Sequence, residues 1–477
     1  SCTSDCLVAA GVAIPNGTQH HFLGVVVSAV GSTASAHGLA GLPALTQHMD
    51  INRHSSSSTS ISPPSDPMGA VKRAYWASLS LATTRGVDRS RGVQAMAKAL
   101  QNAFDDILEA NTLDLEASRE MAVPELILDW LKLTPERLQT TIQILQRIGE
   151  LSDPIRRVMS ASYQLDDSQT YCQLRPLGVI ALISEAFPEL GAIAAGFCIK
   201  TGNCLILRGS SEASQSNQAI AQALQIGLEE AGLPEGCLEL LLPEQGASIR
   251  DLVTQDRYIN LAIPYGRPTL VQQVMQQATV PVLKSAMGNC YLYWSATGSL
   301  DMVRWIIFDS HASEPDPVNA IEKILINRHQ KPSSLAILWN SLKEKGFDLR
   351  GDEELVAEFP EQLKLTAESE WSQPYLDKTI AFKVVDSIES AIAWMNQYSS
   401  SHADCLVTES YQESRQFALG VDSASVYINS SPRFSRNPKR GDAVFLGMSN
   451  QKGYRRGMIN LETLTTLKQV IQGNGQF

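Results

Sequence analysis

Residues 178–183 read GVIALI, a short run without a charged side chain. A strand of a parallel sheet has this composition when helices cover both of its faces and no side chain meets water. Further candidate strands follow at 204–207 (CLIL), 238–242 (LELLL) and 259–263 (INLAI), and helical stretches at 192–200 and 214–231 separate the first three. Strand and helix alternating at this spacing predict right-handed crossovers and a doubly wound parallel α/β sheet.

Helical patterns precede this region. Met96, Leu100, Phe104 and Leu108 recur every four residues, which predicts one apolar helical face from Gly92 onward. A second helix is predicted from Thr134, which can cap the helix while Pro135 fits its first turn, to about residue 149. A second α/β unit is expected after residue 288, with candidate strands at 290–294, 323–326, 334–338, 380–385, 404–407 and 425–428.

Residues 1–67 differ in composition, being rich in Ser, Ala and Gly and poor in cations. Such a stretch buries too little apolar surface to offset its ordering entropy. We therefore expect a disordered extension, a targeting segment or an over-extended start. Residues 22–31 are apolar as in a signal peptide, but no Lys or Arg precedes them.

The charge and the cysteines exclude several classes of protein. A formal net charge of −11 argues against nucleic-acid binding and against docking on an anionic membrane. No run approaches the roughly 18 apolar residues of a membrane span. The eight cysteines are scattered and lack zinc-ligand spacing, so we expect reduced thiols, no metal site and a cytoplasmic location, or an organelle stroma if the extension is a targeting segment.

Phrases across 90–475, each weak alone, together resemble the γ-glutamyl phosphate reductases of the aldehyde dehydrogenase superfamily. The matching phrases are RPLGVI at 175–180, KTGN at 200–203, ILRG at 206–209, ATVPVL at 278–283, VYIN at 426–429 and LETLTT at 461–466. The resemblance implies an aldehyde-dehydrogenase-like fold. It has a Rossmann-type nucleotide-binding domain (68–153 and 173–288), an α/β catalytic-type domain (289–447) and a small oligomerisation arm (154–172 and 448–477).

The resemblance also implies a chemistry. Members of the family reduce γ-glutamyl phosphate to glutamate 5-semialdehyde with NADPH in proline synthesis. They are usually homo-oligomers, so the resemblance implies a dimer or tetramer for this chain. A cysteine thiolate displaces phosphate and forms a thioester, which hydride then reduces. Thiolate suits this role because it is both a good nucleophile and a good leaving group.

The nucleophile itself is replaced in this sequence. The family phrase Gln-Arg-Pro-Gly-Val-Cys-Asn-Ala-Leu-Glu corresponds without a gap to SEPDPVNAIE at 313–322. Val318 therefore takes the cysteine position beside a retained Asn319, and a valine side chain has no lone pair to attack with. Glu314 replaces the family's arginine, which reverses a charge where an acyl phosphate should lie.

Other departures fall in the same predicted pocket. The family's Glu-Ala-Arg-Pro is Glu185-Ala186-Phe187-Pro188 here, and its Ile-Pro-Arg-Gly-Gly is Ile263-Pro264-Tyr265-Gly266-Arg267. Its Gly-Leu-Gly-Ala-Glu segment is replaced around 441–445. Several changes in one pocket predict that the reductase reaction is lost and that the chain has a binding, regulatory or structural role, alone or beside an active paralogue.

An active dehydrogenase with non-standard residues is the alternative. Ser310, Ser313 and Asp316 lie close in sequence to the lost thiol, and His311 is the local candidate for a base. Cys290 is a further thiol, expected in the core.

A cofactor site is predicted in the turn after the second strand. Arg208, Gly209, Ser210 and Ser211 can present backbone N–H groups to a phosphate, and Arg208 could pair with the 2′-phosphate of NADP. A plain strand-to-helix turn with Ser211 as N-cap is the other interpretation. The sequence has no Gly-x-Gly-x-x-Gly fingerprint here.

Overall fold

The computed structural model describes residues 67–161, 163, 168–246, 248–312, 317–453, 455–473 and 475. The elements given below belong to these residues. Apart from Pro67, the predicted amino-terminal extension lies outside them, so its expected disorder stays a prediction.

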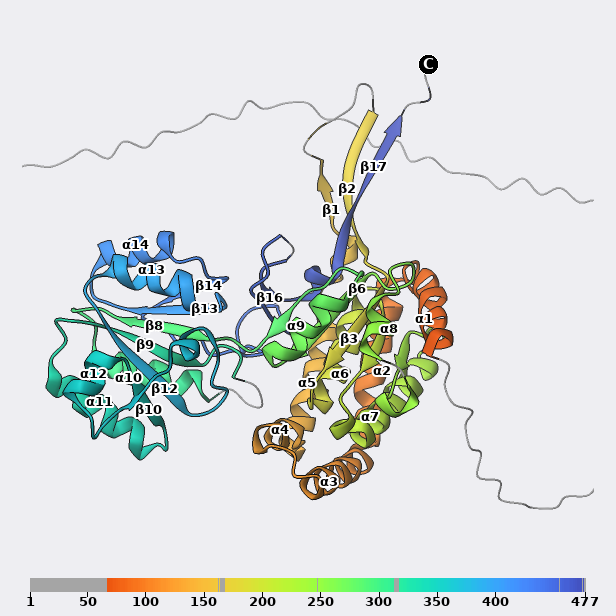
Figure 1. The fold of residues 1–477 in the computed structure, drawn as a ribbon. Helices are drawn as coiled ribbons and strands as arrows, with labels where there is room; N and C mark the ends of the chain where they lie inside the picture. The colour runs from red at the N-terminus through yellow and green to blue at the C-terminus, as the bar shows by residue number, and fades with distance from the viewer. Residues whose placement is uncertain are drawn as a thin grey trace, which may run out of the picture. The chain divides into compact units, whose positions relative to one another are not determined.

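The first sheet is parallel and has the strand order β5-β4-β3-β6-β7 (Figure 1). Its strands are β3 (Val179–Ser184), β4 (Cys204–Arg208), β5 (Leu238–Leu240), β6 (Leu261–Gly266) and β7 (Ser285–Ala286). The chain steps outward from β3 to β4 and β5, then returns to pair β6 with the other edge of β3. This arrangement confirms the predicted doubly wound α/β class.

Helices cover both faces of this sheet. α6 and α7 pack on one face with α2 and α5 behind them, while α1, α8 and α9 pack on the other. Their bounds are α1 (Pro67–Leu81), α2 (Gly86–Asn102), α3 (Phe104–Glu120), α4 (Glu125–Leu131), α5 (Pro135–Glu150), α6 (Pro188–Lys200), α7 (Ser214–Glu230), α8 (Ile249–Val253) and α9 (Pro268–Gln277).

The helices predicted at 192–200 and 214–231 correspond to α6 and α7, and the two earlier predictions differ in outcome. Thr134 caps α5 as expected, because its side chain accepts a hydrogen bond from Arg137 N. The single apolar face predicted from Gly92 is wrong, since the chain breaks at Ala103 between α2 and α3. Met96 and Leu100 are buried on α2, and Phe104 begins a new helix.

A larger parallel sheet follows, with the strand order β11-β10-β12-β9-β8-β13-β14. Its strands are β8 (Cys290–Trp294), β9 (Ile321–Asn327), β10 (Asp348–Gly351), β11 (Lys364–Leu365), β12 (Thr379–Val385), β13 (Ala403–Val407) and β14 (Ser425–Ile428). The helices beside it are α10 (Leu300–Ser310), α11 (Pro332–Glu344), α12 (Glu353–Glu358), α13 (Ile388–Tyr398) and α14 (Tyr411–Gly420).

One predicted strand of this region is wrong. Residues 334–338 lie inside α11, where Leu335, Leu338, Trp339 and Leu342 are buried at helical spacing. Pro332 in the first turn favours the helix, because its fixed φ suits that position.

An antiparallel arm joins the base of the first sheet. It contains β1 (Val158–Ser160), β2 (Ser168–Pro176) and β17 (Thr465–Gly473), in the order β1-β2-β17. The Asn203 side chain, fully buried, accepts a hydrogen bond from Gly178 N and donates one to Leu464 O. One amide therefore ties the start of β3 to the base of β17. A two-stranded sheet of β15 (Gly447–Ser449) and β16 (Gly457–Ile459) lies between β14 and β17 in the sequence.

No helix in the described segments is long and apolar enough to cross a bilayer.

The amino terminus of α7 is capped by a residue from another helix. The Asp114 carboxylate on α3 accepts hydrogen bonds from Gln215 N (3.0 Å), Ser216 N (2.7 Å) and Ser216 Oγ (2.6 Å). A carboxylate suits this place because the first N–H groups of a helix have no partner within the helix.

We predict that Asp114→Asn destabilises the fold by about 1–3 kcal/mol. The NH₂ group of the asparagine would replace one carboxylate oxygen and would face a backbone N–H, to which it cannot bond. Glu109→Gln on the exposed side of the same helix is the matched control and should leave stability unchanged. Urea unfolding followed by circular dichroism measures both. Equal midpoints for the two variants would contradict the capping role.

Candidate functional site

A cavity of about 240 Å³ lies at the carboxyl ends of β3, β4, β5 and β6. Its lining residues lie at the strand ends: Ser184 and Glu185 at the end of β3, Arg208, Ser210, Ser211 and Glu212 at the end of β4, Pro243 after β5 and Arg267 after β6. The return of the chain from β5 to β6 opens this crevice beside β3, the place where doubly wound sheets bind ligands. The structure therefore brings together the side chains of three of the four predicted cofactor residues, while Gly209 contributes a carbonyl that accepts a hydrogen bond from Arg208 Nη1.

The donors of this cavity suit a phosphate-bearing group. Arg208 Nε and Ser210 Oγ are buried and have no hydrogen-bond partner within the described residues. Burial lowers the pKa of Arg208, and the neighbouring Glu244 and Glu212 oppose that change. An acceptor-rich ligand would supply the missing partners. The residues present thus fit the nucleotide that the resemblance implies.

The role of Ser211 as N-cap is wrong. Ser211 opens a 3₁₀ turn (η2, Ser211–Ala213), and α7 begins after it with Ala213 at the N-cap position. The side chain of Asp114 replaces the missing cap from 101 and 102 residues away in sequence from the two amides that it binds, which no local pattern could reveal.

Sequence reasoning missed two charged residues of this cavity as site residues. Glu185 accepts hydrogen bonds from Arg267 N (2.7 Å) and Arg267 Nε (2.8 Å). Their positions after adjacent parallel strands were the available signal, because such strand ends meet at one edge of the sheet.

Val318 lies in the loop before β9 and is 1% exposed. Its side chain belongs to the apolar core, and its carbonyl accepts a hydrogen bond from Gly288 N (2.9 Å). Space beside it is limited, because a Cβ built on Gly288 would lie 2.6 Å from Val318 O and 2.9 Å from Cys290 Sγ. Asn319 is also buried and donates from Nδ2 to Pro432 O (3.1 Å). Glu314, Ser313 and Asp316 lie outside the described residues.

None of the described alternatives is poised to replace the thiol. Ser310 Oγ donates to Ile307 O and accepts from Ile321 N, while His311 Nε2 lies 2.8 Å from Ile321 O. Serine and histidine are thus each engaged with backbone and form no dyad. Cys290 is fully buried, and burial raises the pKa of its thiol well above the ordinary value.

Phe187 and Tyr265, the two positions that the resemblance pairs with family arginines, lie in an aromatic cluster. Phe187 stacks on Trp130 with ring centroids 4.7 Å apart and meets Tyr265 edge-on at 5.5 Å. Both are buried, and the Tyr265 hydroxyl accepts a hydrogen bond from Arg436 Nη2 (2.7 Å). These contacts make Phe187 and Tyr265 part of the core.

A larger cavity of about 1100 Å³ lies beside α5, the start of α6 and residues 433–439. Arg137 and Glu189 form an ion pair on its wall (2.5 Å). Arg147 on α5 donates to Asn437 Oδ1 and Pro438 O (each 2.5 Å) and to Gly441 O. Arg147 thus ties residues 437–441 to α5.

Comparison with known proteins identifies the family. A model of the aldehyde dehydrogenase family matches residues 57–289. γ-Glutamyl phosphate reductase 2 of Synechocystis sp. is 55% identical over 403 residues, 84% of this chain and 96% of that protein. The chain belongs to the γ-glutamyl phosphate reductase family.

Two further relatives support this assignment. The γ-glutamyl phosphate reductase of Gloeobacter violaceus is 39% identical over 406 residues, 85% of this chain and 96% of that protein. The crystal structure of the Thermotoga maritima γ-glutamyl phosphate reductase has a TM-score of 0.78 at 29% identity and covers 86% of this chain and 99% of that chain.

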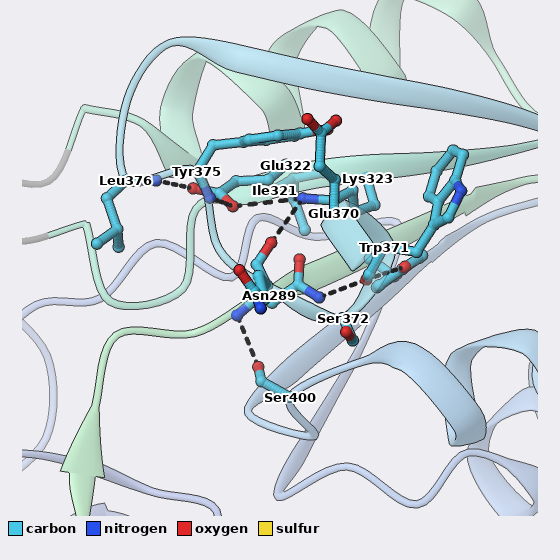
Figure 2. A network of polar contacts seen from close by, with 12 residues as sticks. Asn289, Ile321, Glu322, Lys323, Glu370, Trp371, Ser372, Tyr375, Leu376 and Ser400 are labelled. Atoms are coloured by element: carbon cyan, nitrogen blue, oxygen red, sulfur yellow. Dashed lines mark hydrogen bonds and ion pairs between the residues drawn. The ribbon is translucent and has the colours of Figure 1, made fainter. Parts of the chain in front are cut away.

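A polar network surrounds Glu322 and Lys323 of β9 (Figure 2). Glu322, which this chain shares with the family phrase, accepts hydrogen bonds from Tyr375 N (2.6 Å) and Leu376 N (2.8 Å). Lys323 Nζ lies 3.6 Å from Glu322 Oε2 and 3.6 Å from the centroid of the Tyr375 ring, and it donates to Gln373 O. The network holds the segment before β12 against β9.

Burial controls both ionisations. It raises the pKa of Glu322 to about 7 and lowers the pKa of Lys323 to about 8, and each group's charge opposes the shift of the other. Between pH 4.5, the ordinary pKa of Glu, and about pH 7, the folded protein holds a proton on Glu322 that the unfolded chain has lost, so Glu322 makes stability fall as the pH rises through this interval. The lowered pKa of Lys323 has the opposite effect between about pH 8 and its ordinary pKa of 10.5.

We predict that Lys323→Met costs about 3–5 kcal/mol at pH 8, because a buried carboxylate then lacks its cation. The loss should shrink towards pH 6 as Glu322 becomes protonated, and Glu322→Gln with Lys323→Met should recover part of it. Urea unfolding at both pH values measures this. Lys364→Met, at an exposed ion pair with Asp348, is the control and should change little. A pH-independent loss in Lys323→Met would contradict the assignment.

Proposed function

We propose that this chain is a member of the γ-glutamyl phosphate reductase family that does not carry out cysteine-dependent reduction. It retains the nucleotide cavity and serves a binding, regulatory or structural role. The observation that carries the proposal is Val318, a buried hydrocarbon in the position of the family's thiol.

The thioester route needs a sulfur lone pair to displace phosphate and an environment that stabilises the acyl phosphate. Val318 cannot supply the first. Phe187 and Tyr265 replace two cations that would serve the second, and Glu314 would repel the substrate's phosphate. Each of these replacements favours loss of the reductase reaction. Restoring the family residue at one position would leave the other positions changed.

An active NADP-dependent glutamate 5-semialdehyde dehydrogenase is the second candidate. The 55% identity with a protein named γ-glutamyl phosphate reductase 2 favours it, because that similarity extends over 96% of the relative. This candidate needs a nucleophile other than Ser310, His311 or Cys290.

Assembly through the arm is part of the proposal. β17 lies at an edge of the arm sheet and exposes Leu467 (54%) and Ile471 (49%). An exposed edge strand with apolar side chains favours pairing with another chain. We propose a dimer or tetramer of this chain, or an assembly with an active paralogue. The free cysteines of the described residues support a reducing, cytoplasmic setting.

Turnover separates the two candidates. We predict that the purified protein, given glutamate 5-semialdehyde, NADP and phosphate, produces NADPH no faster than the blank. Val318→Cys with Glu314→Arg should regain little activity, because Phe187 and Tyr265 still lack the arginine charge. Absorbance of NADPH is the measurement. Sustained turnover by the unchanged protein would establish the active candidate instead.

For the arm, we predict that Leu467→Lys with Ile471→Lys shifts the protein to smaller species in sedimentation velocity. The two lysines would place charges in an apolar contact between chains, where each charge would be buried without a partner, so the contact would weaken. Lys468→Gln on the same strand is the matched control and should keep the assembly. An unchanged sedimentation profile for the double variant would remove the arm from the interface.

A further inference from the structure

We propose that Glu185 and Arg267 form an autoinhibitory clasp in the nucleotide cavity. The Glu185 carboxylate accepts hydrogen bonds from the guanidinium and the backbone N–H of Arg267. Without this carboxylate, both donors would be available to bind a nucleotide phosphate. The inference rests on the proposed nucleotide-binding role of this cavity and adds a control on its affinity.

The two residues meet because their strands are neighbours. β3 and β6 pair in parallel with Ser184 opposite Tyr265, so Glu185 and Arg267 follow adjacent strand ends. Arg267 is the N-cap residue of α9, a ten-residue helix. Glu185 is 9% exposed, whereas the Arg267 side chain is 42% exposed. The carboxylate is therefore buried in the cavity wall, and the guanidinium remains accessible from solvent.

The backbone is built closely around this carboxylate. Gly266 has a φ of +147°, and a Cβ at that position would lie 2.5 Å from Glu185 Oε2. Glycine alone accommodates both the conformation and the approach. The carboxylate oxygen accepts the first free N–H at the start of α9, a group that favours anions.

A second observation indicates an anion site at the same place. The unpartnered donors Arg208 Nε and Ser210 Oγ line the cavity together with Arg267. Donors after β4 and donors after β6 thus surround the crevice. The Glu185 carboxylate accepts from those of Arg267, whereas Arg208 Nε and Ser210 Oγ have no acceptor within the described residues. A phosphate carries enough acceptor oxygens to satisfy both sets.

The charges of the lining explain why the internal carboxylate inhibits binding. Arg208 and Arg267 are balanced by Glu185 and Glu212, so the lining has no net positive charge. A phosphate entering beside Arg267 must either displace Glu185 or accept repulsion from it. The inhibition follows from the position of the arginine, which lies two residues beyond its place in the family's Ile-Pro-Arg-Gly-Gly and within reach of Glu185.

The test compares Glu185→Gln, Arg267→Gln and the double variant by isothermal titration calorimetry with NADPH, inorganic pyrophosphate and adenosine. Removing the Glu185 charge should tighten binding of NADPH and pyrophosphate on the order of tenfold, because it ends the competition for Arg267. Arg267→Gln should weaken both, and in the double variant the gain should disappear. Adenosine has no phosphate, so its affinity should be the same throughout.

Glu354→Gln, at the exposed ion pair with Arg328, is the matched control and should change no affinity. If the unchanged protein binds NADPH and Glu185→Gln binds it no more tightly, the clasp is overturned and the nucleotide-binding role survives. If no variant binds NADPH or pyrophosphate, the nucleotide-binding role fails and the clasp fails with it. Should Glu185→Gln not fold, equal phosphate affinity in Arg267→Gln and the unchanged protein would overturn the clasp.

Discussion

The pairing of β3 with strands on both of its edges is the constraint from which the candidate site follows. β3 bonds to β4 on one edge and to β6 on the other, so the chain must leave in one direction and return in the other. Loops from the three strands therefore diverge around the carboxyl end of β3. Glu185 and Phe187 lie directly after this end, which puts Glu185 in the lining of the cavity at the strand ends and Phe187 in the aromatic cluster with Trp130 and Tyr265.

The sequence predicts the interior of this fold well because buried strands carry their own signal. The run at 178–183 becomes β3 with a shift of one residue, and residues 290–294 and 425–428 become β8 and β14 with unchanged bounds. Failures occur where a short apolar run fits two periods, as in α11, or where a helix break such as Ala103 has no Pro or Gly to mark it. Local pattern also cannot show that Asp114 supplies the cap of α7.

The sequence could name candidate site residues but not their surroundings. Val318, Phe187 and Tyr265 were singled out by aligning neighbouring residues with the family phrases, and that assignment stays a prediction. What surrounds them comes from distant segments: Trp130 precedes α5, Arg436 lies near the carboxyl end, and both contact the same aromatic pair. Arg267 illustrates the difference. Its displacement was visible in the sequence, whereas its bond to Glu185 depends on two strand ends meeting.

Fold and chemistry are separable in this chain because different residues carry them. Glu322 binds two backbone N–H groups and a buried lysine, so its loss would unfold the segment before β12. The fold alone therefore explains why this chain has a glutamate there, without any role in a reaction. A reactive thiol or a substrate-facing arginine has few internal contacts, and its replacement by a side chain that packs adds apolar burial. Val318, Phe187 and Tyr265 are all buried and in contact with the core. The packed interior therefore accommodates Val318, Phe187 and Tyr265, and under the proposed loss of the reductase reaction these side chains would leave the sheets and loops unchanged.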